Sequence, residues 1–258
     1  MQPSKVVSCT WGSGKQLAVV MSPVMPEWDE GQFFLPMTIP LVQAGFRVIV
    51  FDTLSLLSDK DESLDDFSHR WHQELLALGK IDLLVGSALG GAVVQVLLGK
   101  ELGFQVKKVL LLSSPAIADP ILDCRLGKMA DLAMLGDVAT ALYLLDQLVQ
   151  PASRISPTSP IEVDLDTASL QGRRLHLGFR LLNRLDVRQA SHDYTGTLLT
   201  VYGEQSQLVR AVNVHINEEA QHYRLPIPDG GMRPLLDAPA LVMSSVCRHL
   251  GIPLGTAA

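Results

Sequence analysis

The sequence predicts an α/β fold, built on a mostly parallel sheet that is flanked by helices. Short apolar segments of strand length alternate with longer amphipathic segments of helical periodicity. This alternation is typical of βαβ units with right-handed crossovers. The segment at 46–52, FRVIVFD, is apolar almost throughout, as expected for a central strand of a parallel sheet that is covered on both faces.

Composition narrows the class of protein. The chain has 258 residues, of which 47% are hydrophobic and 19% charged, so we expect one globular domain over 1–258. A net charge of −6 argues against a nucleic-acid partner, and no apolar run is long enough to span a membrane. The N-terminus lacks the apolar core of a signal peptide. The three widely spaced cysteines, Cys9, Cys124 and Cys247, fit reduced thiols in a cytoplasmic, bacterial-type soluble protein and form no metal motif.

The first half of the chain supplies most of the expected sheet. Leu64, Phe67, Trp71 and Leu75 recur at helical spacing, and a glycine at 79 ends their helix. The expected elements are strands at 5–11 and 16–22 joined by a hairpin or tight turn at 12–15, a helix at 33–44, the strand at 46–52, a helix at 63–78, a strand at 81–86, a helix at 92–102 and a strand at 106–114.

The pattern changes between residues 117 and 190. Helical stretches at Leu126–Val149 and Leu170–Leu185 are separated by a break rich in proline and serine at Pro151–Pro160, and no strand like the earlier ones occurs. We therefore expect a helical insertion at 117–190. Strands resume in TLLTVYGE and HYRLPIP, and a last helix is expected at about Pro239–Leu250.

Five segments, in this order, resemble the α/β-hydrolase family. They are VVMSPVMPEW, AGFRVIVFD, VGSALGG, VYGEQSQLV and LPIPDGGMRPLLDAP, and the resemblance covers about residues 5 to 252. It implies about eight mostly parallel strands, with the insertion at 117–190 acting as a helical cap over the pocket. In VGSALGG it implies a nucleophile elbow, the sharp strand-to-helix turn that exposes a nucleophile.

The resemblance also implies which positions should carry the catalytic triad. The nucleophile position aligns with Ala88, the acid position with Ser206 and the histidine position with Met232. None of these side chains can perform its family role, because acyl transfer needs a nucleophile, a base and a carboxylate that orients the base. Ser87 precedes the nucleophile position, and on such a turn its side chain is expected to point away from the pocket.

Further residues around the pocket follow from the same resemblance. The oxyanion hole would use the backbone N–H of Val24 or Met25 together with that of Leu89. Glu27 and Trp28 would edge the mouth of the pocket, or lie on a solvated loop. Arg233 could bind a carboxylate or phosphate in the pocket, or face solvent. With Ser87, these are the candidate site residues, and no metal or cofactor is expected.

Three functions remain open at this point, and whether the protein is an enzyme is one of the open questions. The first is a catalytically degenerate hydrolase-fold protein, which binds a small apolar or acyl-type ligand or a partner protein without ester hydrolysis. The second is an esterase or thioesterase-like acyl hydrolase in which Ala88 replaces a serine or cysteine. The third is a structural subunit with a collapsed pocket. A homodimer is possible in each case.

Overall fold

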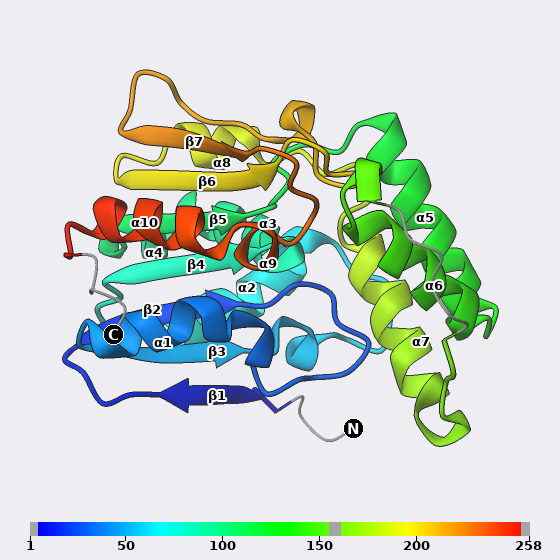
Figure 1. Ribbon diagram of the computed structural model, residues 1–258. Coiled ribbons are helices and arrows are strands. Elements are labelled where there is room, and N and C mark those ends of the chain that lie inside the picture. The colour runs from blue at the N-terminus through cyan, green and yellow to red at the C-terminus, as the bar shows by residue number, and fades with distance from the viewer. Residues whose placement is uncertain (1–4, 155–160, 254–258) are drawn as a thin grey trace.

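The computed structural model describes residues 5–154 and 161–253, and within them seven strands form one sheet (Figure 1). The strand order is β1-β3-β2-β4-β5-β6-β7; β1 is antiparallel to β3, and every other pair is parallel. The strands are β1 (Ser8–Trp11), β2 (Gln16–Met21), β3 (Phe46–Phe51), β4 (Leu83–Ser87), β5 (Lys108–Leu112), β6 (Thr197–Gly203) and β7 (His222–Ile227). The sheet has one strand fewer than the eight or so that the family resemblance implied. Each of its seven strands overlaps one of the seven strand segments expected from the sequence.

The expected hairpin between the first two strands is wrong. β3 lies between β1 and β2, so the residues at 12–15 cross the end of β3 rather than closing a two-stranded ribbon. A Cβ atom on Gly14 would lie 1.8 Å from the backbone oxygen of Gly45, which shows how closely the two chain segments approach. Gly14 is therefore required by this close crossing, since a side chain would not fit there.

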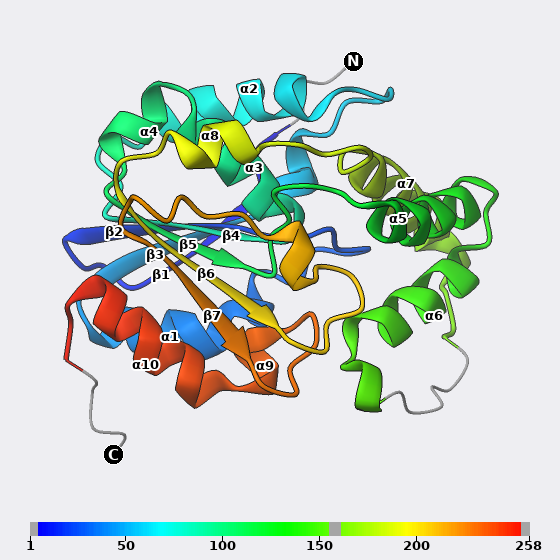
Figure 2. The ribbon, with the colours of Figure 1, turned by 90° about the horizontal axis from the view of Figure 1, so that it is seen from above.

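Helices cover both faces of the sheet (Figure 2). On one face lie α1 (Leu35–Gln43), α9 (Pro234–Asp237) and α10 (Pro239–Leu250); on the other lie α2 (Leu64–Leu76), α3 (Leu89–Leu98), α4 (Glu101–Gln105) and α8 (Arg188–His192). Each face has its own layer of buried apolar side chains. Central strands such as β3 are therefore apolar and buried on both sides along most of their length, as the sequence predicted for the segment at 46–52.

Helix boundaries differ from expectation in three places, and one of them is the stretch expected at Leu170–Leu185, where the helix spans Leu165–Arg180. The helix expected at 92–102 begins at Leu89, immediately after the elbow, and ends at Leu98. The stretch expected at Leu126–Val149 is two helices, α5 (Pro120–Met134) and α6 (Val138–Val149). The break falls at Gly136, which has a φ of +86°, and the Asp137 side chain then accepts a hydrogen bond from Thr140 N at the start of α6.

The helices α5, α6 and α7 (Leu165–Arg180) lie beyond the carboxyl ends of the strands (Figures 1 and 2). The chain leaves the sheet at Ile117 and returns at Asp186, where these two residues form an isolated antiparallel bridge. Two hydrogen bonds flank the bridge, from Ala118 N to Leu185 O and from Val187 N to Ala116 O, both 2.8 Å. That 117–190 is a separate cap insertion within one domain stays a prediction.

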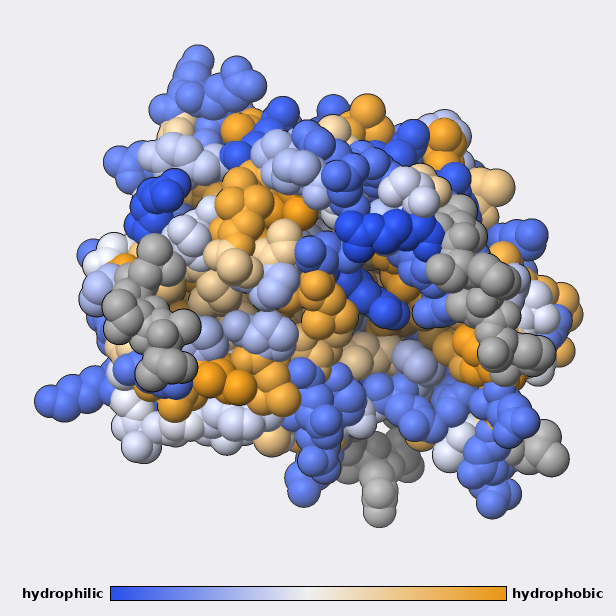
Figure 3. Space-filling view, viewed as in Figure 1, coloured by the Kyte–Doolittle hydropathy of each residue, from blue (hydrophilic) through white to orange (hydrophobic). Residues whose placement is uncertain are grey.

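The surface mixes polar and apolar side chains (Figure 3). Among the described residues, the most exposed large apolar side chains are Phe104, at 91%, and Leu135, at 77%. No described helix has the length and apolar character needed to cross a membrane.

Candidate active site

Ala88 sits on a strained turn between β4 and α3. Its φ of 47° and ψ of −112° lie outside the regions that residues with a side chain normally adopt. The turn is fixed on both sides, because Ala88 N donates to Leu112 O over 3.1 Å and Ala88 O accepts from Ala92 N over 3.0 Å. This is the geometry of a nucleophile elbow, which holds one side chain above the carboxyl end of the sheet.

Three glycines make the turn possible. A Cβ on Gly86 would lie 2.4 Å from Gly91 Cα, and a Cβ on Gly90 would lie 2.2 Å from Met21 O. A Cβ on Gly91 would lie 1.7 Å from the Ser114 hydroxyl. Strand and helix can therefore pack at this distance only where these positions lack side chains, as the sequence VGSALGG predicted.

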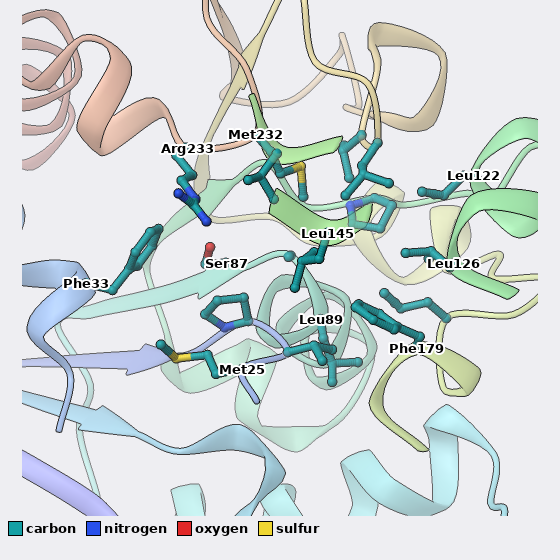
Figure 4. A pocket seen from close by; sticks show the side chains of 18 of the residues that line it. Met25, Phe33, Ser87, Leu89, Leu122, Leu126, Leu145, Phe179, Met232 and Arg233 are labelled. Carbon is teal, nitrogen blue, oxygen red and sulfur yellow. The ribbon is translucent and has the colours of Figure 1, made fainter. Parts of the chain in front are cut away.

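A largely apolar cavity of about 170 Å³ lies above the elbow, between the end of the sheet and the helices α5, α6 and α7 (Figure 4). An apolar cavity of about 150 Å³ is large enough to hold benzene, so this one can hold a small molecule. It is lined by Pro23, Val24, Met25, Pro26, Phe33, Ser87, Ala88, Leu89, Pro115, Leu122, Leu126, Leu145, Val149, Phe179, Leu182, Leu208, Val209, Met232 and Arg233. The pocket is thus open rather than collapsed, contrary to the third hypothesis.

The structure brings the three aligned triad positions together. Ala88 and Met232 line the same cavity, and the buried Ser206 hydroxyl lies 3.7 Å from Met232 Sδ. Residues 206 and 232 therefore contact each other as an acid and a histidine would, with residue 232 between residue 206 and the cavity. At these positions Ala88 carries a methyl group, Met232 a thioether and Ser206 a hydroxyl.

No histidine reaches the cavity. The chain has seven histidines, all within the described residues, and none of them lines it. His222 begins β7 at the amino end of the sheet, away from the cavity, and burial lowers its pKa. No carboxylate of the described residues lines the cavity either. Among the described residues, no group of three or more His, Cys, Asp or Glu side chains could hold a metal ion.

Most of the predicted pocket residues line the cavity, and two do not. Val24, Met25, Leu89 and Arg233 are in its wall. Glu27 and Trp28 are not, contrary to the placement at the pocket mouth. The Glu27 carboxylate accepts a hydrogen bond from Gln171 Nε2 over 2.7 Å, and Trp28 packs against the apolar layer under α1 and α10.

The expected direction of Ser87 is wrong. Its side chain lines the cavity, and Figure 4 shows it on the side where Phe33 and Arg233 lie. The reason is the alternation of side chains along β4, since Ser87 shares a sheet face with Val85, two residues before it. Ser87 has no histidine near it that could remove its proton, so its position does not make it an activated nucleophile.

A buried ion pair behind the cavity was not found by sequence reasoning. Arg174, on α7, donates two hydrogen bonds of 2.8 and 2.9 Å to the Asp52 carboxylate at the end of β3. Its Nε donates a third, of 2.9 Å, to Met25 O in the predicted oxyanion loop. One guanidinium therefore ties helix α7 to the sheet and to the wall of the cavity.

The sheet order, the elbow and the helices above it define the α/β-hydrolase fold. No known family model matches the sequence, and no curated protein does. The fold is instead shared with solved structures of low sequence identity. An alpha/beta hydrolase enzyme from a Medee basin deep-sea metagenome library is 12% identical, with a TM-score of 0.79, and the match covers 98% of this chain and 96% of that one.

Two further structures are similar over almost their whole length. A bromoperoxidase from Bacillus anthracis is 16% identical, and an esterase from Exiguobacterium antarcticum is 14% identical. For both, the TM-score is 0.74 and the match covers 95% of each chain. Identities this low show a shared fold, and the activity of this chain has to be argued from its own cavity.

Proposed function

We propose that this protein is a hydrolase-fold protein without the catalytic triad, and that its cavity binds a small apolar or acyl-type ligand without hydrolysing esters. The observation that carries the proposal is the combination of an open, apolar cavity with Ala88, Met232 and Ser206 at the triad positions. A cavity of this kind gains binding free energy from apolar contact, and its walls offer no base to activate a nucleophile or water.

The absence of a base also bears on the alternative that Ala88 replaces the nucleophile of an esterase. The elbow geometry is intact, which favours that alternative. However, a serine at position 88 would still need a histidine to accept its proton, and position 232 carries a methionine. We therefore propose that the residues at all three triad positions, and not Ala88 alone, prevent ester hydrolysis.

The proposal is tested with one uncharged acyl probe, octanamide, and one chromogenic ester, p-nitrophenyl butyrate. Isothermal titration calorimetry should detect octanamide binding, and ester hydrolysis should equal the rate in buffer. Ester turnover above the buffer rate that a change at a cavity residue abolishes would contradict the proposal, and so would the absence of octanamide binding.

A pair of tryptophan variants on α6 tests whether the ligand binds in the cavity. Leu145, on α6, lines the cavity, so Leu145→Trp should remove octanamide binding by occupying the space. Tyr143→Trp places the same side chain on the same helix at an exposed position outside the cavity wall, and it should bind octanamide as the unaltered protein does. Equal binding by both variants would place the ligand elsewhere.

A further inference from the structure

The geometry points to an anionic head group on the ligand: we infer that the cavity binds an amphipathic monocarboxylate, with its carboxylate at Arg233 and its apolar chain under α5, α6 and α7. This inference rests on the proposed function and adds the chemical class of the ligand. Three observations carry it. The Arg233 side chain has no partner among the described residues, the N-terminus of α3 has no side-chain cap, and the polar groups lie on one side of the cavity.

Among the described residues, Arg233 is the only charged side chain in the cavity wall. Its side chain is half-buried, and it makes no hydrogen bond or ion pair with any described residue. The other arginines in the described ranges that are not fully exposed, Arg70, Arg125, Arg173, Arg174, Arg180 and Arg210, each donate to a carboxylate or a carbonyl oxygen.

A carboxylate is the chemical group that best complements an unpaired guanidinium in an apolar wall. A guanidinium presents a planar fork of donors that matches the two oxygens of a carboxylate. Figure 4 shows the Arg233 guanidinium directed into the cavity, on the side where Ser87 lies. Within 5–154 and 161–253 no acidic side chain lines the cavity, so a bound anion would meet no like charge from these residues.

The start of helix α3 adds to the same preference. The helix begins at Leu89, has ten residues, and has no side chain that caps its N-terminus. Its first N–H groups and the positive end of its dipole therefore favour a negative charge beside Ala88. Ser87, whose hydroxyl makes no hydrogen bond with a described residue, offers a further donor on the same side.

The opposite side of the cavity is apolar. Leu122 and Leu126 of α5, Leu145 of α6 and Phe179 of α7 form this side (Figure 4). A ligand that satisfies both sides has a charged end and a hydrocarbon end. A purely apolar ligand would leave the Arg233 guanidinium with a reduced contact with water and no partner, which costs free energy.

The test compares three probes of equal chain length by calorimetry: octanoate, octanamide and octylammonium. The unaltered protein should bind octanoate about 10- to 100-fold more tightly than octanamide, the range expected for a charge-assisted hydrogen bond. Octylammonium should bind more weakly than octanamide. Arg233→Gln should weaken octanoate binding by about the same factor and leave octanamide affinity within about twofold.

Two further variants control for folding and for charge. Arg233→Lys keeps the charge without the planar fork and should show an intermediate octanoate affinity. Arg224→Gln removes an exposed arginine on β7 that does not line the cavity, and it should bind octanoate as the unaltered protein does. An equal loss of octanoate binding in Arg224→Gln would mean that only the net charge matters, and would overturn the inference.

The outcomes separate this inference from the proposed function. If octanoate and octanamide bind equally well, the cavity binds ligands but the inferred anion site is wrong. If Arg233→Gln weakens both probes equally while remaining folded by circular dichroism, Arg233 supports the wall and does not recognise the head group. If octanamide does not bind the unaltered protein, the proposed function itself is wrong.

Discussion

At the scale of single residues, Ala88 keeps the backbone of a nucleophile elbow while carrying only a methyl group. Its positive φ is held by the hydrogen bonds on either side and by the glycines around it. The sequence pattern VGSALGG was sufficient to predict this turn, because each glycine is required by a close approach, of backbone at Gly86 and Gly90 and of the Ser114 side chain at Gly91. The direction of Ser87 was harder to predict, since it depends on which sheet face β4 presents at its last residue.

Restoring the nucleophile alone should not restore catalysis. Ala88→Ser places a hydroxyl in the cavity without a base, so we expect ester hydrolysis to stay at the buffer rate. The triple variant Ala88→Ser, Ser206→Asp, Met232→His rebuilds the full arrangement and should hydrolyse p-nitrophenyl butyrate above the rate of the single variant. Activity of the single variant equal to that of the triple variant would contradict this account of positions 206 and 232.

The elbow glycines give a second prediction at this scale. Gly90→Ala would push a methyl group against Met21 O, so the backbone would have to shift, and we expect a loss of about 2 kcal/mol in the free energy of unfolding. Gly127→Ala, inside α5 with no atom within 4 Å, should instead stabilise by about 0.5 kcal/mol or more. Urea unfolding measures both, and equal effects would show that crowding is not the cause.

At the scale of elements, the buried Asp52–Arg174 pair joins α7 to the end of β3. The two residues are 122 positions apart, and no local pattern connects them, so this pairing was not predictable from sequence. Helix α10, by contrast, was predicted with its observed bounds, because its periodicity and the glycine that follows it are local signals. Likewise, the pairing of β1 with β3 is a long-range choice that the neighbouring strand segments do not reveal.

Removing one partner of the buried pair should be costly. Arg174→Gln leaves the Asp52 carboxylate buried without its counter-charge, and we expect a loss of about 3 kcal/mol in the free energy of unfolding. The neighbouring Arg173 pairs with Asp59, and their side chains are 37% and 74% exposed. Arg173→Gln should therefore cost less than about 1 kcal/mol. Chemical denaturation checks both values, and similar losses would argue against a special role for the buried pair.

At the scale of the whole molecule, stability should fall as the solution becomes mildly acidic. Burial, together with the nearby Lys108 ammonium, lowers the pKa of His249 to about 4. Below its unfolded pKa of about 6.5 the unfolded chain therefore binds a proton that the folded chain excludes. This destabilises the folded state progressively between about pH 6.5 and pH 4, by on the order of 2 kcal/mol.

The lowered carboxylate pKa values act in a different range. Asp82, Asp119 and Asp186 have lowered pKa values, so the stability they contribute is lost only as the pH falls below about 4. His249→Asn should accordingly reduce the loss of stability between pH 6.5 and pH 4, measured by urea unfolding at each pH. His69→Asn, at an exposed position, serves as the control; an equal reduction in that variant would contradict the assignment to His249.

The cavity also has a mechanical consequence. Space inside a folded protein that the unfolded chain does not contain makes the volume of the system smaller on unfolding, and hydrostatic pressure favours the smaller volume. The roughly 170 Å³ above Ala88 should therefore lower the pressure at which the protein unfolds. Leu145→Trp fills that space, so this variant should unfold at a higher pressure than the unaltered chain. Tryptophan fluorescence under pressure measures the two unfolding pressures.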